Sequence, residues 1–440
     1  MLVFEFKIYG KVLQFKAIDE AIRTTQFIRN KAIRLWMDGE AKSWVELSRH
    51  CALLASEFPF ASKLNSMARQ AAAERAWASI SRFYDNCKKK ISGKKAENAV
   101  LGSPPPGSEV STRREPPRLE LPHQVERFSK TGYPTFQKDC RSVEYKSTGW
   151  KLSENRKSIV FSDKNGIGKL KIKGTRDLNF YQPDQIKRVR LIKRADGYYV
   201  QFCISIDRTE TIAPTHQIVG LDVGLSCFYT DSLGNKAENP RFYRTGERKM
   251  KRSQRLVSRK VKGSSNRRKA RTFVSRVHLK ISRQRKDHAV KLARCVITSN
   301  DVVVYEDLRI KNMVKNHCLA KSINDAGWYQ FRVWLEYFGK VFKRITIAVN
   351  PSYTSQKCSN CGSIVKKSLS TRTHVCQCGC KLDRDHNASL NILNLGLGTV
   401  GHTGTFALDT SATLSAGASN ASGETTSTLA GVILLEQAVS

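Results

Sequence analysis

The sequence predicts an α+β protein of several domains, and three patterns lead to this fold class. Short alternating runs, typical of strands, lie before and after a long helical stretch in the N-terminal half. Farther along, two continuous apolar strands that end near Asp222 and Glu306 are separated by helical segments, as in an α/β domain. Of the 12 cysteines, five lie between Cys358 and Cys380, which indicates a small ribbon held by metal.

The composition points to a polyanionic partner. The 440 residues include 76 Lys and Arg against 38 Asp and Glu, so the formal net charge is +38. Such a chain repels itself unless a polyanion neutralises it; nucleic acid is the expected one, and an anionic membrane surface is the alternative. No stretch approaches the roughly 20 apolar residues of a membrane span, and the N-terminus lacks the pattern of a secretory signal. We therefore expect a cytoplasmic protein that has no membrane partner.

The N-terminal half should combine strands with a helical insertion. Residues 1–16 alternate like a strand, and apolar residues recur at helical spacing over about 17–90. A connection rich in Pro, Ser and Gly follows at about 100–125. Short strands separated by turn residues fill 126–210, and a small β-barrel is the expected arrangement.

A strongly basic segment follows the first apolar strand of the C-terminal half. Residues 241–294 contain 21 Lys and Arg, and only Glu247 and Asp287 are acidic. Apolar residues thread this segment, which predicts long basic helices. A solvated helix face normally mixes charges of both signs. The bias therefore predicts contact with nucleic acid through salt-dependent phosphate contacts.

Three acidic residues stand where metal chemistry would need them. Asp222 and Glu306 lie at the ends of apolar strands, and Asp385 lies in an acidic turn that opens the last helix. Carboxylates that converge from different elements can hold two Mg²⁺ ions for phosphoryl transfer. Each has a simpler interpretation: Asp222 could be a turn residue, Glu306 could end a surface strand, and Asp383 and Asp385 could start a helix.

The cysteine cluster has the spacing of metal ligands. Cys358-x-x-Cys361 followed by glycine is a zinc knuckle, and a second pair should complete four thiolates in a tetrahedral, structural site. Candidates for that pair are Cys376, Cys378 and Cys380. We expect the other cysteines to be reduced core thiols.

The order of the acids and their surrounding motifs carry a resemblance. Asp after a first strand, then Glu, then Asp on a helix resembles the order of RuvC-like nucleases in the RNase H fold. The full set resembles TnpB, the transposon-encoded RNA-guided nuclease related to type V CRISPR effectors, from residue 1 to about 397. The motifs are Ile-Val-Gly-Leu-Asp-Val-Gly-Leu at 218–225, Val-Val-Tyr-Glu-Asp-Leu at 303–308, Tyr-Thr-Ser-Gln-Lys-Cys-Ser-Asn-Cys-Gly at 353–362, Leu-Asp-Arg-Asp-His-Asn-Ala-Ser-Leu-Asn-Ile at 382–392, and the similar barrel stretch at 132–145.

The resemblance implies an activity and its residues. Asp222, Glu306 and Asp385 would hold two Mg²⁺ ions and hydrolyse DNA, with Asp383 as the alternative third acid. A guide RNA would read double-stranded target DNA by base pairing. The family usually reads Asn-Ala-Ala where this chain has Ser389 as the third residue. By the same resemblance, we expect a prokaryotic protein that is associated with the nucleoid when it is bound to DNA. We expect it to be a monomer.

The resemblance also implies the domains and the zinc ligands. Counting back from Asp383 makes Cys358, Cys361, Cys376 and Cys378 the ligands of a structural Zn²⁺, although Cys376 is one residue closer than the family pattern and Cys380 could replace it or Cys378. The expected domains are a β-barrel (1–16 and 126–212), a helical insertion with linker (17–125), an RNase H-like nuclease domain (213–350 and 381–397), an inserted zinc ribbon (351–380) and a disordered tail (398–440).

Two other functions fit the same motifs. The chain could be an RNA-guided DNA-binding protein that does not cut, although the presence of all three acids argues against it. It could also be a transposase of RNase H-like fold that joins DNA ends without a guide.

Overall fold

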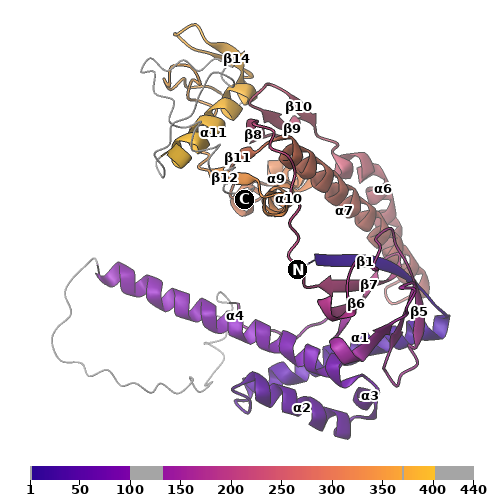
Figure 1. Ribbon diagram of the computed structural model, residues 1–440. Helices are drawn as coiled ribbons and strands as arrows, with labels where there is room; N and C mark the ends of the chain where they lie inside the picture. The colour runs from indigo at the N-terminus through magenta and orange to yellow at the C-terminus, as the bar shows by residue number, and fades with distance from the viewer. Residues whose placement is uncertain (1, 100–131, 369–370, 402–440) are drawn as a thin grey trace, which may run out of the picture. The chain divides into compact units, whose positions relative to one another are not determined.

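The chain is a mixed α/β protein that divides into two units, Met1–Asp207 and Arg208–Ser440 (Figure 1). No helix among the described residues is long and apolar enough to cross a membrane. The predicted connection at 100–125 and the tail beyond Gly401 lie outside these residues. The computed structural model describes residues 2–99, 132–368 and 371–401.

The first unit contains a seven-stranded antiparallel sheet in the order β2-β6-β7-β1-β5-β4-β3. The N-terminal strand lies in its middle, where Phe4 is opposite Phe202. No ladder joins β2 to β3 within the described residues, so closure into a barrel stays a prediction. The strands are β1 (Leu2–Tyr9), β2 (Ser142–Tyr145), β3 (Trp150–Leu152), β4 (Ser158–Phe161), β5 (Lys169–Lys173), β6 (Ile186–Arg194) and β7 (Gly197–Ile204).

Helices occupy the chain between β1 and β2. The predicted strand over 1–16 is too long, because β1 ends at Tyr9 and α1 begins at Val12. The side chain of Gln14 accepts a 2.9 Å hydrogen bond from the amide of Lys11, which caps the first turn and favours a helix there. The helices are α1 (Val12–Met37), α2 (Trp44–Glu57), α3 (Pro59–Ser62) and α4 (Ser66–Ala99).

The second unit contains a five-stranded mixed sheet in the order β10-β9-β8-β11-β12. The first three strands in the sequence form an antiparallel meander, whereas β11 pairs parallel to β8 and β12 pairs parallel to β11. Parallel neighbours end at the same edge of the sheet, which brings their final residues together. The strands are β8 (Ile218–Val223), β9 (Cys227–Asp231), β10 (Lys236–Glu238), β11 (Val302–Glu306) and β12 (Ile345–Val349).

Helices cover both faces of this second sheet (Figure 1). On one face, α7 (Ser265–Ser299) and α10 (Trp328–Val341) bury their apolar residues against Val219, Leu221 and Val303. On the other face, α11 (Arg384–Gly401) packs Ile392 on Val302 and Val304. The alternation of side chains along a strand therefore decides which helix each strand residue meets.

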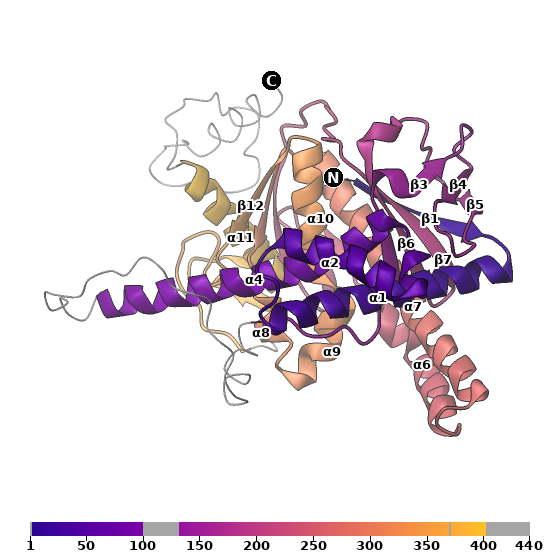
Figure 2. The ribbon, with the colours of Figure 1, turned by 90° about the horizontal axis from the view of Figure 1, so that it is seen from below.

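The basic segment is helical, as predicted. It forms α6 (Phe242–Ser258) and α7, which pack through the small buried cluster of Met250, Val277 and Ile281 (Figure 2). The last helix continues to Gly401, past residue 398, where the tail was predicted to begin. Two short helices precede α10, namely α8 (Ile310–Met313) and α9 (His317–Ala326), and a hairpin of β13 (Thr373–Val375) and β14 (Lys381–Asp383) precedes α11.

Candidate carboxylate site and cysteine cluster

Asp222 and Glu306 lie side by side at the same edge of the second sheet. Tyr305 is the partner of Leu221 in the parallel pairing of β8 and β11, so the next pair along the two strands is Asp222 and Glu306. Leu221 and Tyr305 point into the core beneath α7 and α10. The two carboxylates therefore point to the opposite face, which α11 covers.

Two glycines let α11 lie directly on the strands. A Cβ atom on Gly220 would come within 2.3 Å of the carbonyl oxygen of Ser389, and one on Gly396 within 2.5 Å of Val304 Cγ1. Real Cβ atoms do not approach other atoms so closely, so both positions require glycine at this helix–sheet distance. Asp385, one turn before Ser389, is thereby carried to the edge where Asp222 lies.

The three predicted acids interact electrostatically. Burial raises the pKa of Asp222 well above its usual value, and the charges of Glu306 and Asp385 raise it further. Arg384 opposes these effects on the pKa of Asp222 without overcoming them. Burial also raises the pKa of Glu306, although a hydrogen bond from Thr354 counteracts it. Burial and the neighbouring carboxylates thus make the ionised form of Asp222 less favourable, an effect that a bound divalent cation would relieve.

Asp383 and Asp385 have different surroundings. Asp383 Oδ1 accepts hydrogen bonds from the amides of Asp385 (2.9 Å) and His386 (3.4 Å), and thus caps α11. Its other oxygen accepts a 2.9 Å bond from Lys236 Nζ. Burial alone would raise the pKa of Asp383, but these partners lower it below its usual value. The helix-start interpretation of this turn thus applies to Asp383, and the charges of both Asp385 and, more weakly, Asp383 raise the pKa of Asp222.

Arg384 is a residue of the site that the sequence patterns did not single out. Its Nε and one terminal nitrogen each donate to Asp385 Oδ1 at 3.1 Å, and the other terminal nitrogen donates to the carbonyl of Thr371. In the sequence, its only distinguishing feature is its position between Asp383 and Asp385. The structure shows it as a cation that orients Asp385.

Thr354 and Asn391 are two further residues of the site that no sequence pattern indicated. The hydroxyl of Thr354 donates to Glu306 Oε1 at 2.6 Å, and the backbone carbonyl of Thr354 accepts a 2.8 Å bond from Asn391 Nδ2. All three residues are at least partly buried, so water does not compete freely for these bonds. A polar chain therefore runs from α11 through Thr354 to the carboxylate on β11.

Four cysteine sulfurs form a compact group. The Sγ atoms of Cys358, Cys361, Cys376 and Cys378 lie within 4.8 Å of one another, with 3.5 Å between Cys361 and Cys376 and 3.7 Å between Cys358 and Cys378. Four thiolates about 2.3 Å from a tetrahedral Zn²⁺ would be separated by about 3.8 Å. This donor set could therefore hold a metal ion of that kind.

The backbone turns around these cysteines are alike despite their different spacings. Gly362, with φ +79°, follows Cys361, and Gly379, with φ +86°, follows Cys378. Each glycine amide donates a 3.0 Å bond to the carbonyl of the first cysteine of its pair. Cys380 lies outside the group of four and instead forms a second possible set with Cys358 and His374. The closely spaced pair Cys376 and Cys378 can therefore form a knuckle turn without Cys380.

The cysteine loop is tied to the helix that carries Asp385. Asn387 Oδ1 accepts a 2.9 Å bond from the amide of Ser359, and its Nδ2 donates to the carbonyl of Lys357 at 2.8 Å. Asn391 donates to the same carbonyl at 2.7 Å. Both asparagine side chains are buried. The first knuckle and α11 are therefore positioned together.

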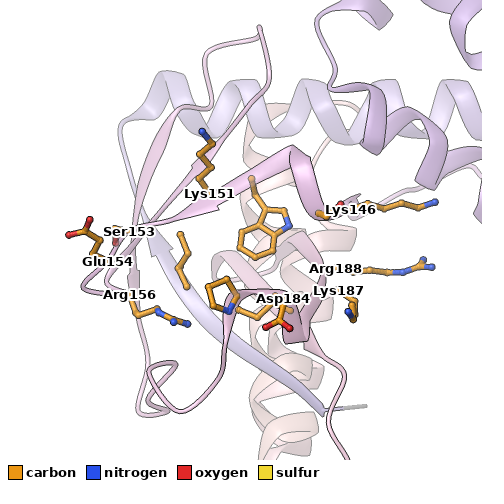
Figure 3. Close-up of a pocket in the computed structure, with 13 residues that line it drawn as sticks. Lys146, Lys151, Ser153, Glu154, Arg156, Asp184, Lys187 and Arg188 are labelled. Carbon is orange, nitrogen blue, oxygen red and sulfur yellow. The ribbon is translucent and has the colours of Figure 1, made fainter.

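The first unit contains a cavity of about 1110 Å³ (Figure 3). The residues that line it differ in kind from those of the carboxylate site. Lys146 and Arg188 on its rim are both bound to Glu74. Glu154 and Asp184 add negative charge among the cations. The lining contains no converging carboxylates or thiols, so the carboxylate edge of the second sheet remains the candidate catalytic site.

Comparisons with known families place this arrangement in context. Residues 201–317 match the family described as "Probable transposase", and residues 328–392 match "Cas12f1-like, TNB domain". The first match includes Asp222 and Glu306, and the second includes the four cysteines and Asp385.

Several known proteins are similar to parts of the chain. A "Putative RNA-guided DNA endonuclease" of Streptomyces pristinaespiralis is 40% identical over 207 residues, which are 46% of this chain and 51% of that protein. The chain thus matches about half the length of this relative. The "Putative RNA-guided DNA endonuclease InsQ" of Escherichia coli K12 is 28% identical over 285 residues, 61% of this chain and 69% of its own. Others are named TnpB-like proteins. A Cas12f1 chain solved with sgRNA and target DNA overlaps 87% of this chain and 81% of its own at 13% identity, with a TM-score of 0.47.

Proposed function

We propose that this chain, which is similar to TnpB proteins over the matched segments, is an RNA-guided, metal-dependent endonuclease that cuts double-stranded DNA and is associated with a transposable element. One observation carries the catalytic part of this proposal. Asp222 and Glu306 end neighbouring parallel strands, and the charge of Asp385 on the covering helix acts on Asp222. The names of the relatives support RNA guidance and DNA as the substrate.

The second unit is proposed to be an RNase H-like nuclease domain of the RuvC kind. Its support is the sheet order, in which a meander of three strands is followed by two parallel strands, together with acids on β8, on β11 and on the helix after β12. The first unit is proposed to be the β-barrel with its helical insertion, and the cysteine loop to be the inserted ribbon. The boundaries are those predicted above, except that the first barrel strand ends at Tyr9 and the last helix extends to Gly401.

The carboxylates of Asp222, Glu306 and Asp385 are the proposed ligands of two Mg²⁺ ions. When bound, such ions activate water and stabilise the leaving oxygen in phosphodiester hydrolysis. The chain contributes orientation: Thr354 holds Glu306 through a 2.6 Å bond, and Arg384 holds Asp385. Asp383 caps α11 through Oδ1 and is bound to Lys236 through Oδ2, so it stays the alternative third acid.

The four-cysteine group is proposed to bind a structural Zn²⁺. Four thiolates leave no open position for a water molecule, which excludes a hydrolytic role for this ion. Asn387 joins the knuckle to α11 two residues after Asp385. Loss of the metal would therefore loosen the catalytic helix.

A guide RNA and target DNA are the proposed partners, with the protein as a monomer. The α6–α7 pair supports nucleic-acid contact, because it carries most of the 21 basic residues of segment 241–294 and its buried cluster is small. Phosphate contacts of this kind give affinity that falls with salt and does not depend on sequence. Base pairing with the guide would then supply the specificity.

The experiment is to purify the protein expressed beside its native flanking DNA and to sequence the bound RNA. A structured RNA that ends in a variable stretch is expected, and DNA matching that stretch should be cut when Mg²⁺ is added. Asp222→Ala should abolish cutting and retain RNA and target binding. If the mutant folds but loses RNA, a purely catalytic role of Asp222 is excluded.

The family description "Probable transposase" makes guide-independent DNA joining the second candidate. Transposon-end DNA incubated without RNA separates the two functions. Joined or paired ends would support the transposase. RNA-dependent target binding without any cut by the unmodified chain would instead indicate an RNA-guided binding protein.

A further inference from the structure

Lys236 lies in line with the carboxylate site, on the edge strand β10 of the second sheet. It is opposite Thr230 in the pairing of β10 with β9, and Thr230 is in turn opposite Asp222 on β8. Residues that are directly opposite on neighbouring strands project from the same face of a sheet. Ala237, the next residue on β10, packs against the core beneath α7 and α10. Lys236 therefore projects from the other face, the one that Asp222 shares and α11 covers.

The side chain of Lys236 ends at Asp383, 147 positions later in the chain. Its Nζ donates a 2.9 Å hydrogen bond to Asp383 Oδ2, and the two side chains are 43% and 38% exposed. An ion pair with this exposure contributes little to folding, so stability alone does not account for it. Asp383 Oδ1 is already used by the cap of α11, where it accepts from the amides of Asp385 and His386. Lys236 therefore occupies the oxygen of Asp383 that the helix cap leaves over.

Asp385 has one oxygen that is held less firmly. Arg384 donates to its Oδ1 through two nitrogens, each at 3.1 Å. The ion pair that the described residues give to its Oδ2 is looser, because a nitrogen of Arg372 lies 3.8 Å away and that side chain is 59% exposed. A separation of 3.8 Å is too long for a hydrogen bond. Asp385 can therefore offer Oδ2 to a cation, whereas the corresponding oxygen of Asp383 is bound to Lys236.

Both acids lie near enough to Asp222 to act on it. Their charges raise the pKa of Asp222, and Asp385 does so more than Asp383. The two acids are only two residues apart at the start of α11, and the cap uses one oxygen of Asp383. Either carboxylate could therefore complete a cation site with Asp222 and Glu306. The choice between them depends on which oxygen is free, and Lys236 controls one of the two.

We propose that Lys236 selects the third metal ligand of the carboxylate site. By holding Asp383 Oδ2, it keeps Asp383 in the cap of α11 and leaves Asp385 to bind the cation. Lys236 is a positioning residue, because it acts through Asp383. Without Lys236, Asp383 Oδ2 is free and Asp383 can replace a missing Asp385. This inference rests on the proposed function, since it concerns the ligands of the proposed Mg²⁺ site.

The test measures Mn²⁺ binding to the full-length protein, without cleavage, from the loss of the EPR signal of free Mn²⁺. Binding that Asp222→Ala removes is assigned to the carboxylate site. Asp385→Ala should weaken this binding about tenfold or more, and adding Lys236→Met should restore most of it, because Asp383 then supplies the missing ligand. With Asp385 intact, Lys236→Met should strengthen binding only about twofold, the effect of removing one exposed charge. Lys236→Arg keeps the ion pair and should restore nothing in the Asp385→Ala protein.

Two controls separate an exchange of ligands from a general change of charge. Lys381→Met removes an exposed lysine from β14, the strand that ends at Asp383, and should restore nothing in the Asp385→Ala protein. Asp383→Asn keeps an oxygen that can cap α11 and should cancel the gain from Lys236→Met.

The outcomes distinguish the inference from the proposed function. Equal gains from Lys236→Met with and without Asp385 would reflect only the loss of one charge and overturn the inference. A gain that survives Asp383→Asn, or Mn²⁺ binding that Asp385→Ala leaves unchanged, overturns it as well. If Asp222→Ala removes no Mn²⁺ binding from the wild type, the proposed metal site itself is wrong, and the inference falls with it.

Discussion

The hydroxyl of Thr354 donates a 2.6 Å hydrogen bond to Oε1 of Glu306, a residue 48 positions earlier in the chain. Thr354 is itself held by Asn391 of α11, through its backbone carbonyl. Glu306 on β11 and the helix that carries Asp385 are therefore connected through one buried residue. The geometry of the carboxylate site depends on this loop as well as on the acids.

Thr354→Val should impair cleavage, and Thr354→Ser should largely restore it. Valine keeps the shape of threonine but removes the donor, and a hydrogen bond to a charged group contributes about 1.5–3 kcal/mol, so we expect a loss of roughly tenfold or more in cutting rate. Single-turnover rates at saturating Mg²⁺ measure this effect. Equal rates for the valine and serine variants would show that the hydroxyl does not orient Glu306.

Asp222→Asn should raise the melting temperature of the metal-free protein at neutral pH while abolishing cleavage. The folded-state pKa of Asp222 is raised, so the folded protein binds its proton more tightly than the unfolded chain does. As pH rises from the usual carboxyl value to the raised one, stability is lost, and asparagine removes that loss. Melting curves in a chelator, at neutral pH and near pH 4, test this prediction. The gain should shrink at the lower pH, and a gain that is equal at both would point to another cause.

As the pH is lowered, metal binding should begin to weaken at a higher pH than it would if the ligands were carboxylates with their usual pKa values. Burial raises the pKa of Asp222 and of Glu306, and both must lose their protons to bind a cation. The cutting rate at limiting Mg²⁺ should therefore decline on acidification while the pH is still above the usual carboxyl value of about 4. Excess Mg²⁺ should move the midpoint to lower pH, because metal and protons compete. A midpoint that is independent of Mg²⁺ would contradict direct competition.

Gly220→Ala should destabilise the protein, and Gly398→Ala should not. A Cβ on Gly220 meets the backbone of α11 at 2.3 Å, whereas one on Gly398 meets nothing within 4 Å. Overpacking of this kind typically costs about 1–3 kcal/mol, while an exposed helical glycine replaced by alanine gains up to about 1 kcal/mol. Thermal unfolding of the two variants measures the difference. A stable Gly220→Ala protein that still cuts would show that α11 can move away from the strands.

Cys378→Ser should lose zinc, and Cys380→Ser should keep it. Of these two cysteines, only Cys378 belongs to the group of four whose sulfurs lie within 4.8 Å of one another, although Cys380 lies close by. Metal content of the purified variants by elemental analysis tests this choice. The opposite result would mean that Cys380 completes the site in place of Cys378.

The elements that carry the site were readable from local patterns. Apolar runs predicted β8 and β11, and the basic segment predicted α6 and α7. Asp222 and Glu306 lie at the ends of β8 and β11, as the apolar runs indicated. These features depend on periodicity and spacing, which a short stretch of chain contains in full. The end of β1 was missed because residues 12–16 alternate like a strand, and the Gln14–Lys11 contact that starts α1 has no comparable pattern.

The sequence by itself determined which residue types could do the chemistry: the acids at the strand ends, the four thiols and the net charge of +38. Only the tertiary structure decided how they are used. It gave Asp383 to the cap of α11, connected Thr354 to Glu306, placed α11 against Gly220 and left the indole donor of Trp328 without an acceptor among the described residues. Except for the cap of α11, these relationships join residues far apart in the chain or depend on what surrounds a buried atom. Neither propensity nor spacing encodes such distances, because long-range packing sets them.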